Sequence, residues 1–189
     1  RRYVPLIGDV APADLAVHSA GSSLAKALFL LSEKNLGTSV AHLLHQSDWI
    51  LGCLCGRFGV SDENNALKLG YDPLQRRWPD WLSDCGVPCN LLPDVYPPGT
   101  DIAPVSDAVA HQLGLNPAAR VLTGTTDSTA AALASGICSP GQAVTSLGST
   151  LVMKIVAENP VFSSRHGVYS HRLGDLWLVG GASNSGGAV

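Results

Sequence analysis

The residues that could carry chemistry gather between positions 123 and 154, in the segment TGTTDSTAAALASGICSPGQAVTSLGSTLVMK. Within it, Asp127 lies where a strand ending at Leu122 becomes a helix expected over residues 129–135. A carboxylate near the N-terminus of a helix is held ionised and oriented by the helix dipole. This position therefore predicts a side chain that can accept a proton from a substrate.

A glycine-containing turn follows Asp127. Residues 143–147 and 151–156 are β-prone runs separated by Gly148, Ser149 and Thr150, which predicts a hairpin whose tight turn needs glycine. Without a side chain at Gly148 a phosphate could approach the main chain closely, and the two hydroxyls could add hydrogen bonds. A base beside a phosphate-binding turn indicates phosphoryl transfer to a hydroxyl group.

Each motif also has a plain structural interpretation. Asp127 or Ser128 can cap the helix, a contribution of about 1 kcal/mol, and the glycine turn can be an ordinary hairpin. The cap and the catalytic role are compatible, because phosphoryl transfer asks mainly for an oriented nucleophile and stabilised charge. The presence of both motifs favours catalysis.

At these residues the chain resembles the FGGY family of carbohydrate kinases, most closely its ribulose and xylulose kinase branch. The resemblance rests on GTTDS at 124–128, on SLGST at 146–150 and on DWILGCLCGRFGVSDENNALKLGYD at 48–72. It implies that Asp127 is the catalytic base that receives the proton of a sugar hydroxyl. It also implies that the turn at Gly148, Ser149 and Thr150 is the family's second phosphate motif, which binds ATP.

The resemblance further implies an α/β fold of the actin-like or RNase H-like ATPase type, with the active site between two domains. Ser139-Pro140-Gly141 is the predicted boundary, so residues 1–138 are expected to be the later part of the first domain and residues 139–189 the start of the second. The family's first phosphate motif, DxGTxxxR, and its adenosine motif are not found. We interpret the chain as an internal fragment, inactive alone, of an enzyme that uses ATP and Mg²⁺.

Composition excludes several classes of protein. Hydrophobic residues make up 46% of the 189 residues, enough for a packed core, and charged residues only 14%, with a net charge of −3. No basic run indicates nucleic-acid binding, and no apolar run is long enough to cross a bilayer. The five cysteines are odd in number and lack paired CxxC spacing, which favours a reducing cytoplasm or plastid stroma over a disulfide or zinc framework. We expect a sugar and ATP as partners; the sequence does not indicate the oligomeric state.

Apolar periodicity predicts two helices that pack together, one over residues 21–34 with Ser22 as its cap and one over residues 39–55. Residues 61–103 are rich in Pro, Gly and Asn, which predicts a loop-rich region with short helices. A further helix is expected over residues 106–113.

Weaker candidates lie outside the main motifs. Asp62 could contact sugar hydroxyls, although Asx residues in such turns more often cap the local backbone. His42 and His45 share a predicted helix face but lack a third ligand at suitable spacing, so no metal site is predicted. The glycine-rich run at 180–187 matches neither GxGxxG nor the Walker pattern and is assigned to close packing.

The sequence therefore predicts ATP-dependent phosphorylation of a sugar hydroxyl, with a ketopentose, D-ribulose or D-xylulose, as the expected substrate. One alternative is a non-catalytic sugar or nucleotide sensor that keeps the same cleft. A second is a serine hydrolase with an SxxK motif at Ser23 to Lys26, a pattern that here lacks the accompanying KTG element.

Overall fold

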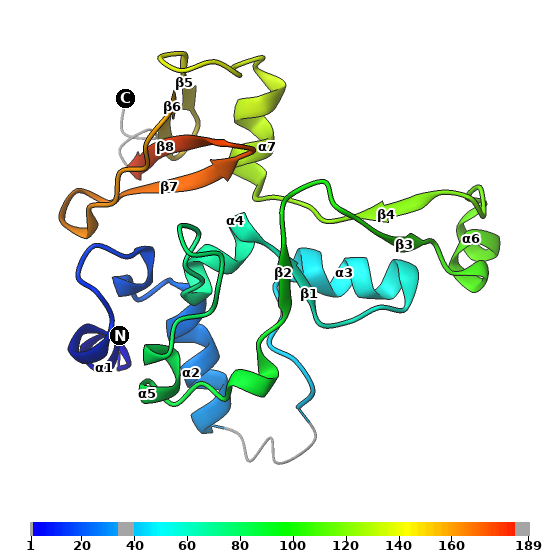
Figure 1. Ribbon diagram of the computed structural model, residues 1–189, viewed down its shortest axis with the longest axis horizontal. Helices are drawn as coiled ribbons and strands as arrows, with labels where there is room; N and C mark the ends of the chain where they lie inside the picture. Colours follow the sequence, from blue (N-terminus) through cyan, green and yellow to red (C-terminus); the bar gives the residue numbers. More distant parts are fainter. Residues whose placement is uncertain (1, 34–39, 184–189) are drawn as a thin grey trace.

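The computed structural model describes residues 2–33 and 40–183 (Figure 1). Short helices fill the first two thirds of the chain, and a four-stranded sheet follows. The α-helices are α1 (Val4–Val10), α2 (Ser23–Glu33), α3 (Gln46–Cys55), α4 (Glu63–Ala66), α5 (Trp81–Asp84), α6 (Asp107–Leu113) and α7 (Asp127–Ala134). The 3-10 helices are η1 (Ala16–His18), η3 (Leu67–Leu69), η4 (Cys89–Leu91) and η5 (Ser164–His166).

The strands form three separate sheets within the described residues. They are β1 (Val60–Asp62), β2 (Asp94–Tyr96), β3 (Asp101–Pro104), β4 (Arg120–Leu122), β5 (Ala143–Leu147), β6 (Leu151–Ala157), β7 (Val168–Leu173) and β8 (Leu176–Ser183). Strands β1 and β2 pair in parallel and β3 and β4 antiparallel, while the third sheet is antiparallel with the order β5-β6-β8-β7. The hairpin expected around Gly148 is confirmed: β5 and β6 pair up to Leu147 and Leu151 on either side of the turn.

Buried apolar side chains form three clusters. The first joins α1, η1 and α2 to the α5 region through Ile7, Val17, Leu24 and Leu82. The second lies among α3, β1, β3, β4 and α6, and the third lies between α7 and the four-stranded sheet. In the third cluster, Ala132 and Ile137 pack with Val156 and Leu178, so α7 packs against the four-stranded sheet that follows it. The division of the chain after residue 138 stays a prediction.

The helix predicted over 39–55 is too long. The described part of this segment is non-helical from residue 40 to 45, and α3 begins only at Gln46. The backbone N–H of Leu43 donates to the carbonyl of Leu91 at 2.7 Å, and the N–H of His45 donates to the Asp48 carboxylate at 2.9 Å. These bonds fix a non-helical segment that leads into a capped helix start, so the apolar stripe is divided between two structures.

The prediction that the helices now seen as α2 and α3 pack together is also wrong, because they belong to different cores. Leu24 of α2 lies in the first cluster and Leu51 of α3 in the second. Other expectations are confirmed: the Ser22 hydroxyl accepts from the N–H of Ala25 at 3.2 Å, and α6 begins after Ser106. The five cysteines are free thiols, and none of the helices in the described part of the chain is long and apolar enough for a bilayer.

Candidate active site

A loop rich in threonine carries Asp127 from β4 into α7. Thr123 is 5% exposed, and its hydroxyl donates to the carbonyl of Pro97 at 2.7 Å while it accepts from the N–H of Thr100 at 2.8 Å. The N–H of Gly99 donates in turn to the Thr123 carbonyl at 2.9 Å. The exit of β4 is therefore tied to the turn at 97–100.

Thr126, and neither Asp127 nor Ser128, is the N-cap of α7. Its hydroxyl accepts from the N–H of Thr129, and Asp127 is the first helical residue. One carboxylate oxygen of Asp127 accepts from the N–H of Ser128 at 2.6 Å, and the side chain is exposed. The helix N–H groups thus orient a carboxylate that a substrate and solvent can reach.

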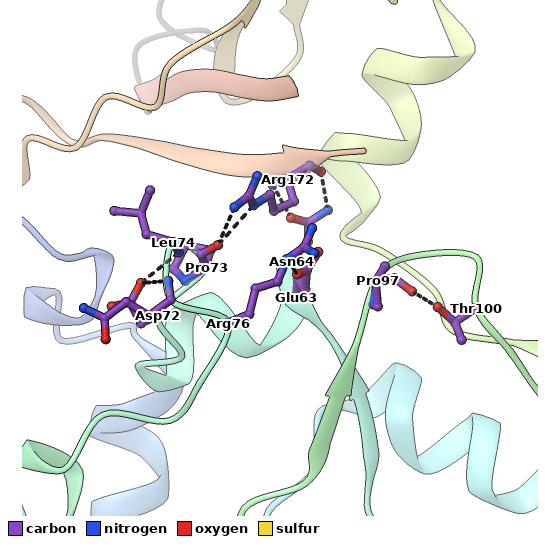
Figure 2. A network of polar contacts seen from close by, with 10 residues as sticks. Glu63, Asn64, Asp72, Pro73, Leu74, Arg76, Pro97, Thr100 and Arg172 are labelled. Atoms are coloured by element: carbon purple, nitrogen blue, oxygen red, sulfur yellow. Dashed lines mark hydrogen bonds and ion pairs between the residues drawn. The ribbon is translucent and has the colours of Figure 1, made fainter. Parts of the chain in front are cut away.

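Asn64 of α4 connects this loop to strand β7 by hydrogen bonds. Its carboxamide nitrogen donates to the Thr125 hydroxyl at 3.0 Å. The same nitrogen donates to the Arg172 carbonyl at 3.0 Å, and the carboxamide oxygen accepts from the N–H of Arg172 at 2.8 Å (Figure 2). Strand β7 is an edge strand, so Asn64 supplies the hydrogen bonds that a neighbouring strand would supply. One side chain, 1% exposed, therefore connects α4, the loop before Asp127 and β7.

The Arg172 side chain strengthens the same junction. Its guanidinium donates twice to the carbonyl of Pro73, at 3.0 and 2.9 Å (Figure 2). Its Cζ lies 3.9 Å from the centre of the Trp177 ring. Beside it, Arg76 pairs with the buried Glu63 at 2.9 Å. A cavity of about 400 Å³ lies here, with Asn64 and Arg172 among its lining residues. The helical part and the sheet therefore meet along a cleft held by specific polar bonds.

Basic groups from the sheet and from η3 lie close to one another, and the charge of Asp127 acts on one of them, Lys154. The Lys154 ammonium on β6 lies 3.1 Å from Nδ1 of His171 on β7, and both residues are buried. Burial, together with the charge of Lys68, lowers the pKa of Lys154 to about 8, whereas the charge of Asp127 acts to raise it. Burial and the neighbouring ammonium groups of Lys154 and Lys68 lower the pKa of His171 to about 3. His171 is therefore neutral at pH 7.

The turn at Gly148, Ser149 and Thr150 is solvent-accessible at the end of the β5–β6 hairpin. The N–H of Gly148 donates within the turn to the carbonyl of Thr150 at 3.3 Å. Gly148 has no positive φ, and a Cβ there would lie 3.7 Å from that carbonyl oxygen, an ordinary contact. The turn geometry therefore does not demand glycine, contrary to the expectation, although the open space suits close approach of an anion. Phosphate binding at this turn stays a prediction.

Asp62 caps α4. Its carboxylate accepts from the N–H groups of Asn64 and Asn65, at 2.9 and 3.0 Å, and from the Asn65 carboxamide at 2.6 Å. The side chain is 1% exposed, and burial raises its pKa. These bonds describe the local capping role that the sequence allowed; a sugar contact of Asp62 stays a prediction.

The histidines at 42 and 45 do not share a helix face, because both lie in the non-helical segment before α3. Within residues 2–33 and 40–183 no group of three or more His, Cys, Asp and Glu side chains is placed to hold a metal ion. Gly180, in β8, lies against the Met153 carbonyl of β6. Residues 180–183 of the glycine-rich run belong to β8, and residues 184–187 fall outside the described residues.

Sequence reasoning missed two members of this site, Lys154 and His171. Lys154 stands at the fourth position of an alternating strand, where a buried apolar side chain is expected, and this break in the pattern is the signal that could have singled it out. His171 lies in a strand of mixed polarity and gave no such signal. The contact of Asn64 with Arg172 was also not predicted, since nothing in the sequence links these two residues.

No model of a protein family matches the sequence. Autoinducer-2 kinases of Photorhabdus laumondii and Klebsiella pneumoniae are each 31% identical to it over 111 residues. The match covers 58% of this chain and 21% of each relative, so the chain spans about a fifth of the length of these curated relatives.

Solved structures of sugar kinases cover nearly the whole chain. Xylulose kinase from Rhodospirillum rubrum matches 96% of it with a TM-score of 0.84 and 21% identity, and gluconate kinase from Lactobacillus acidophilus matches 99% with a TM-score of 0.85 and 16% identity. The chain spans 39% and 40% of those structures. The predicted fold, an incomplete α/β fold of the actin-like ATPase type, is confirmed, and so is the resemblance to FGGY carbohydrate kinases.

Proposed function

We propose that this chain is part of an ATP-dependent carbohydrate kinase in which Asp127 is the catalytic base. The observation that carries the proposal is the exposed Asp127 carboxylate, oriented at the start of α7 by a loop that Thr123, Thr126 and Asn64 fix. This loop belongs to a chain with the fold of sugar kinases.

In the proposed reaction a sugar hydroxyl attacks the γ-phosphorus of ATP. The new bond joins the sugar oxygen to phosphorus, the bond between the γ-phosphorus and the bridging oxygen breaks, and ADP leaves. Asp127 accepts the proton of the attacking hydroxyl, a task for which a weakly basic but well-placed carboxylate suffices. Ser149 and Thr150 donate hydrogen bonds to phosphate oxygens, and the open space at Gly148 lets the phosphate reach the main chain.

ATP and Mg²⁺ belong to the proposal. Mg²⁺, when bound, neutralises charge on the phosphates. The described residues hold no carboxylate cluster that fits it, so we assign it no ligand in this chain and no step.

The proposed acceptor is a ketopentose, D-ribulose or D-xylulose. Support comes from the resemblance to the ribulose and xylulose kinase branch and from the likeness to a xylulose kinase structure. Other similar proteins are named for gluconate, glycerol and autoinducer-2, so the support for a sugar or sugar-like alcohol is broader than that for a pentulose. We further propose that residues 1–138 and 139–189 belong to two domains of the parent enzyme.

The test is a panel of acceptors given to the full-length protein with Mg-ATP. Ribulose, xylulose, hexuloses, gluconate and glycerol are compared by ADP release, and the phosphorylated product is identified by mass spectrometry. We expect turnover to be highest with a ketopentose. Sugar binding without ADP release from any acceptor would contradict the kinase proposal and favour a sensor.

A further inference from the structure

Lys154 is a buried ammonium with little to balance its charge. It is 5% exposed, and within the described residues the only hydrogen bond of its ammonium is the 3.1 Å contact to His171 Nδ1. An ammonium has three N–H donors, so two of them lack an acceptor in that part of the chain. Burying a charge without an ion-pair partner is unfavourable by several kcal/mol. A buried ammonium of this kind, with a lowered pKa, is therefore a candidate member of a functional site.

The sheet is built to hold this ammonium in place. Lys154 on β6 pairs with Gly180 on β8, which in turn pairs with Tyr169 on β7, two residues from His171 on the same face. The Lys154 side chain passes over Gly180, where a Cβ would lie 3.0 Å from Lys154 Cγ and would also meet the Met153 carbonyl. The absence of a side chain at position 180 therefore lets Lys154 cross β8 and reach His171.

The contact fixes the tautomer of His171. An ammonium can only donate, so Nδ1 must accept, and the proton of the neutral ring lies on Nε2. His171 is 1% exposed, and its Nε2 has no hydrogen-bond partner in the described part of the chain. The pair thus presents a fixed ammonium and a buried, unmatched N–H donor.

The groups around this pair are mostly positive. Lys68 of η3 acts on both residues, and its ammonium lies 5.6 Å from the centre of the Tyr169 ring, which packs edge-on to His171. Asp127 of α7 is the acid whose charge acts on Lys154. Two ammonium groups and one carboxylate leave an excess of positive charge around the Lys154–His171 pair, and an anionic ligand would balance it.

We propose that Lys154 is a second catalytic residue, whose ammonium, held by His171 and attracted by the charge of Asp127, binds a non-bridging oxygen of the phosphoryl group in transfer. This inference rests on the kinase function proposed above. The oxygen that gives its proton to Asp127 is the one that bonds to phosphorus, so the phosphorus lies one covalent bond from the atom that contacts the base. Lys154 keeps its proton throughout and stabilises charge that is spread over the equatorial oxygens.

The test compares Lys154→Met with wild type in the full-length protein. Methionine suits a buried site and removes the charge, and Lys26→Met, an exposed lysine on α2, is the matched control. We expect kcat to fall roughly 100-fold in Lys154→Met, with Mg-ATP affinity unchanged. The affinity for Mg-ADP with fluoroaluminate and sugar, measured by calorimetry, should fall by a similar factor, and Lys26→Met should match wild type.

The pH profile gives an independent readout. Because the charged form of Lys154 is the active one, wild-type kcat should decline as pH rises through about 8, where Lys154 loses its proton. His171→Asn keeps an acceptor near Nδ1 and should retain more activity than His171→Leu. If Lys154→Met fails to fold, a wild-type kcat that stays constant to pH ~10 would still overturn the inference.

The outcomes separate the two proposals. Wild-type kinase activity with a Lys154→Met variant that retains full kcat and analogue affinity would overturn the role of Lys154 and leave the kinase proposal standing. No ADP release from wild type with any acceptor would overturn both.

Discussion

Replacing Asn64 with alanine removes three hydrogen bonds from the junction between α4, the loop before Asp127 and β7. The bonds measure 2.8 to 3.0 Å, and two of them fall on the backbone N–H and carbonyl of Arg172. With Asn64 only 1% exposed, water does not reach these groups while the junction stays closed. We expect Asn64→Ala to expose the backbone N–H and carbonyl of Arg172, at the edge of β7, to solvent.

The size of the effect follows from the bonds that Arg172 loses. Each contributes about 1 kcal/mol net, so the closed form of this edge is weakened by about 2 kcal/mol. Since 1.36 kcal/mol corresponds to a tenfold change in an equilibrium constant, the Arg172 N–H should exchange with solvent roughly 30-fold faster.

Hydrogen exchange resolved at the Arg172 amide is the assay. Asn65→Ala is the matched control, because Asn65 lies on the same helix and bonds Asp62 rather than β7. The control should leave exchange at Arg172 unchanged. Equal exchange at Arg172 in wild type and Asn64→Ala would refute the view that Asn64 satisfies the edge of β7.

Three further results are expected. Thr126→Ala removes the cap of α7 and should lower the free energy of unfolding, measured in urea, by about 1 kcal/mol; no change would contradict the cap. Burial lowers the pKa of His171 from 6.5 to about 3, so between these pH values the folded form binds fewer protons than the unfolded form, and stability falls as pH drops through this range. The melting temperature of His171→Asn should therefore fall less than that of wild type between pH ~7 and ~4. Equal falls would count against this linkage. Met153 and Ile155 expose apolar surface on β6, with 52% and 43% of their surface accessible. Changing both to lysine should raise the solubility of the 189-residue chain in a sedimentation assay. Unchanged solubility would show that this face does not drive association.

Local patterns predicted the region around Asp127 well. The strand ending at Leu122, the helix through 129–134 and the hairpin around Gly148 each depend on side chains within a few positions of one another. Such signals are contained in the sequence because propensity, capping and turn chemistry act over short distances. The resemblance carried by the same residues then indicated the fold.

Long-range contacts could not be predicted in the same way. The helix expected over 39–55 was wrong because Leu43 bonds Leu91, far away in sequence, and extends the chain before α3. Asn64 reads as a local turn residue, yet its partner Arg172 is 108 positions away. Lys154 and His171 meet only because Gly180 lies between their strands. Pairings of this kind depend on the tertiary fold, which periodicity does not encode.

The exchange of Asp127 for asparagine tests the central claim most directly. In the full-length protein with Mg-ATP and its best acceptor, Asp127→Asn should lower kcat roughly 100-fold or more while ATP affinity stays near wild type. Asp107→Asn is the matched control, because Asp107 is also the exposed first residue of a helix, α6, that follows a polar cap position. Wild-type kcat in Asp127→Asn would contradict the assignment of Asp127 as the catalytic base.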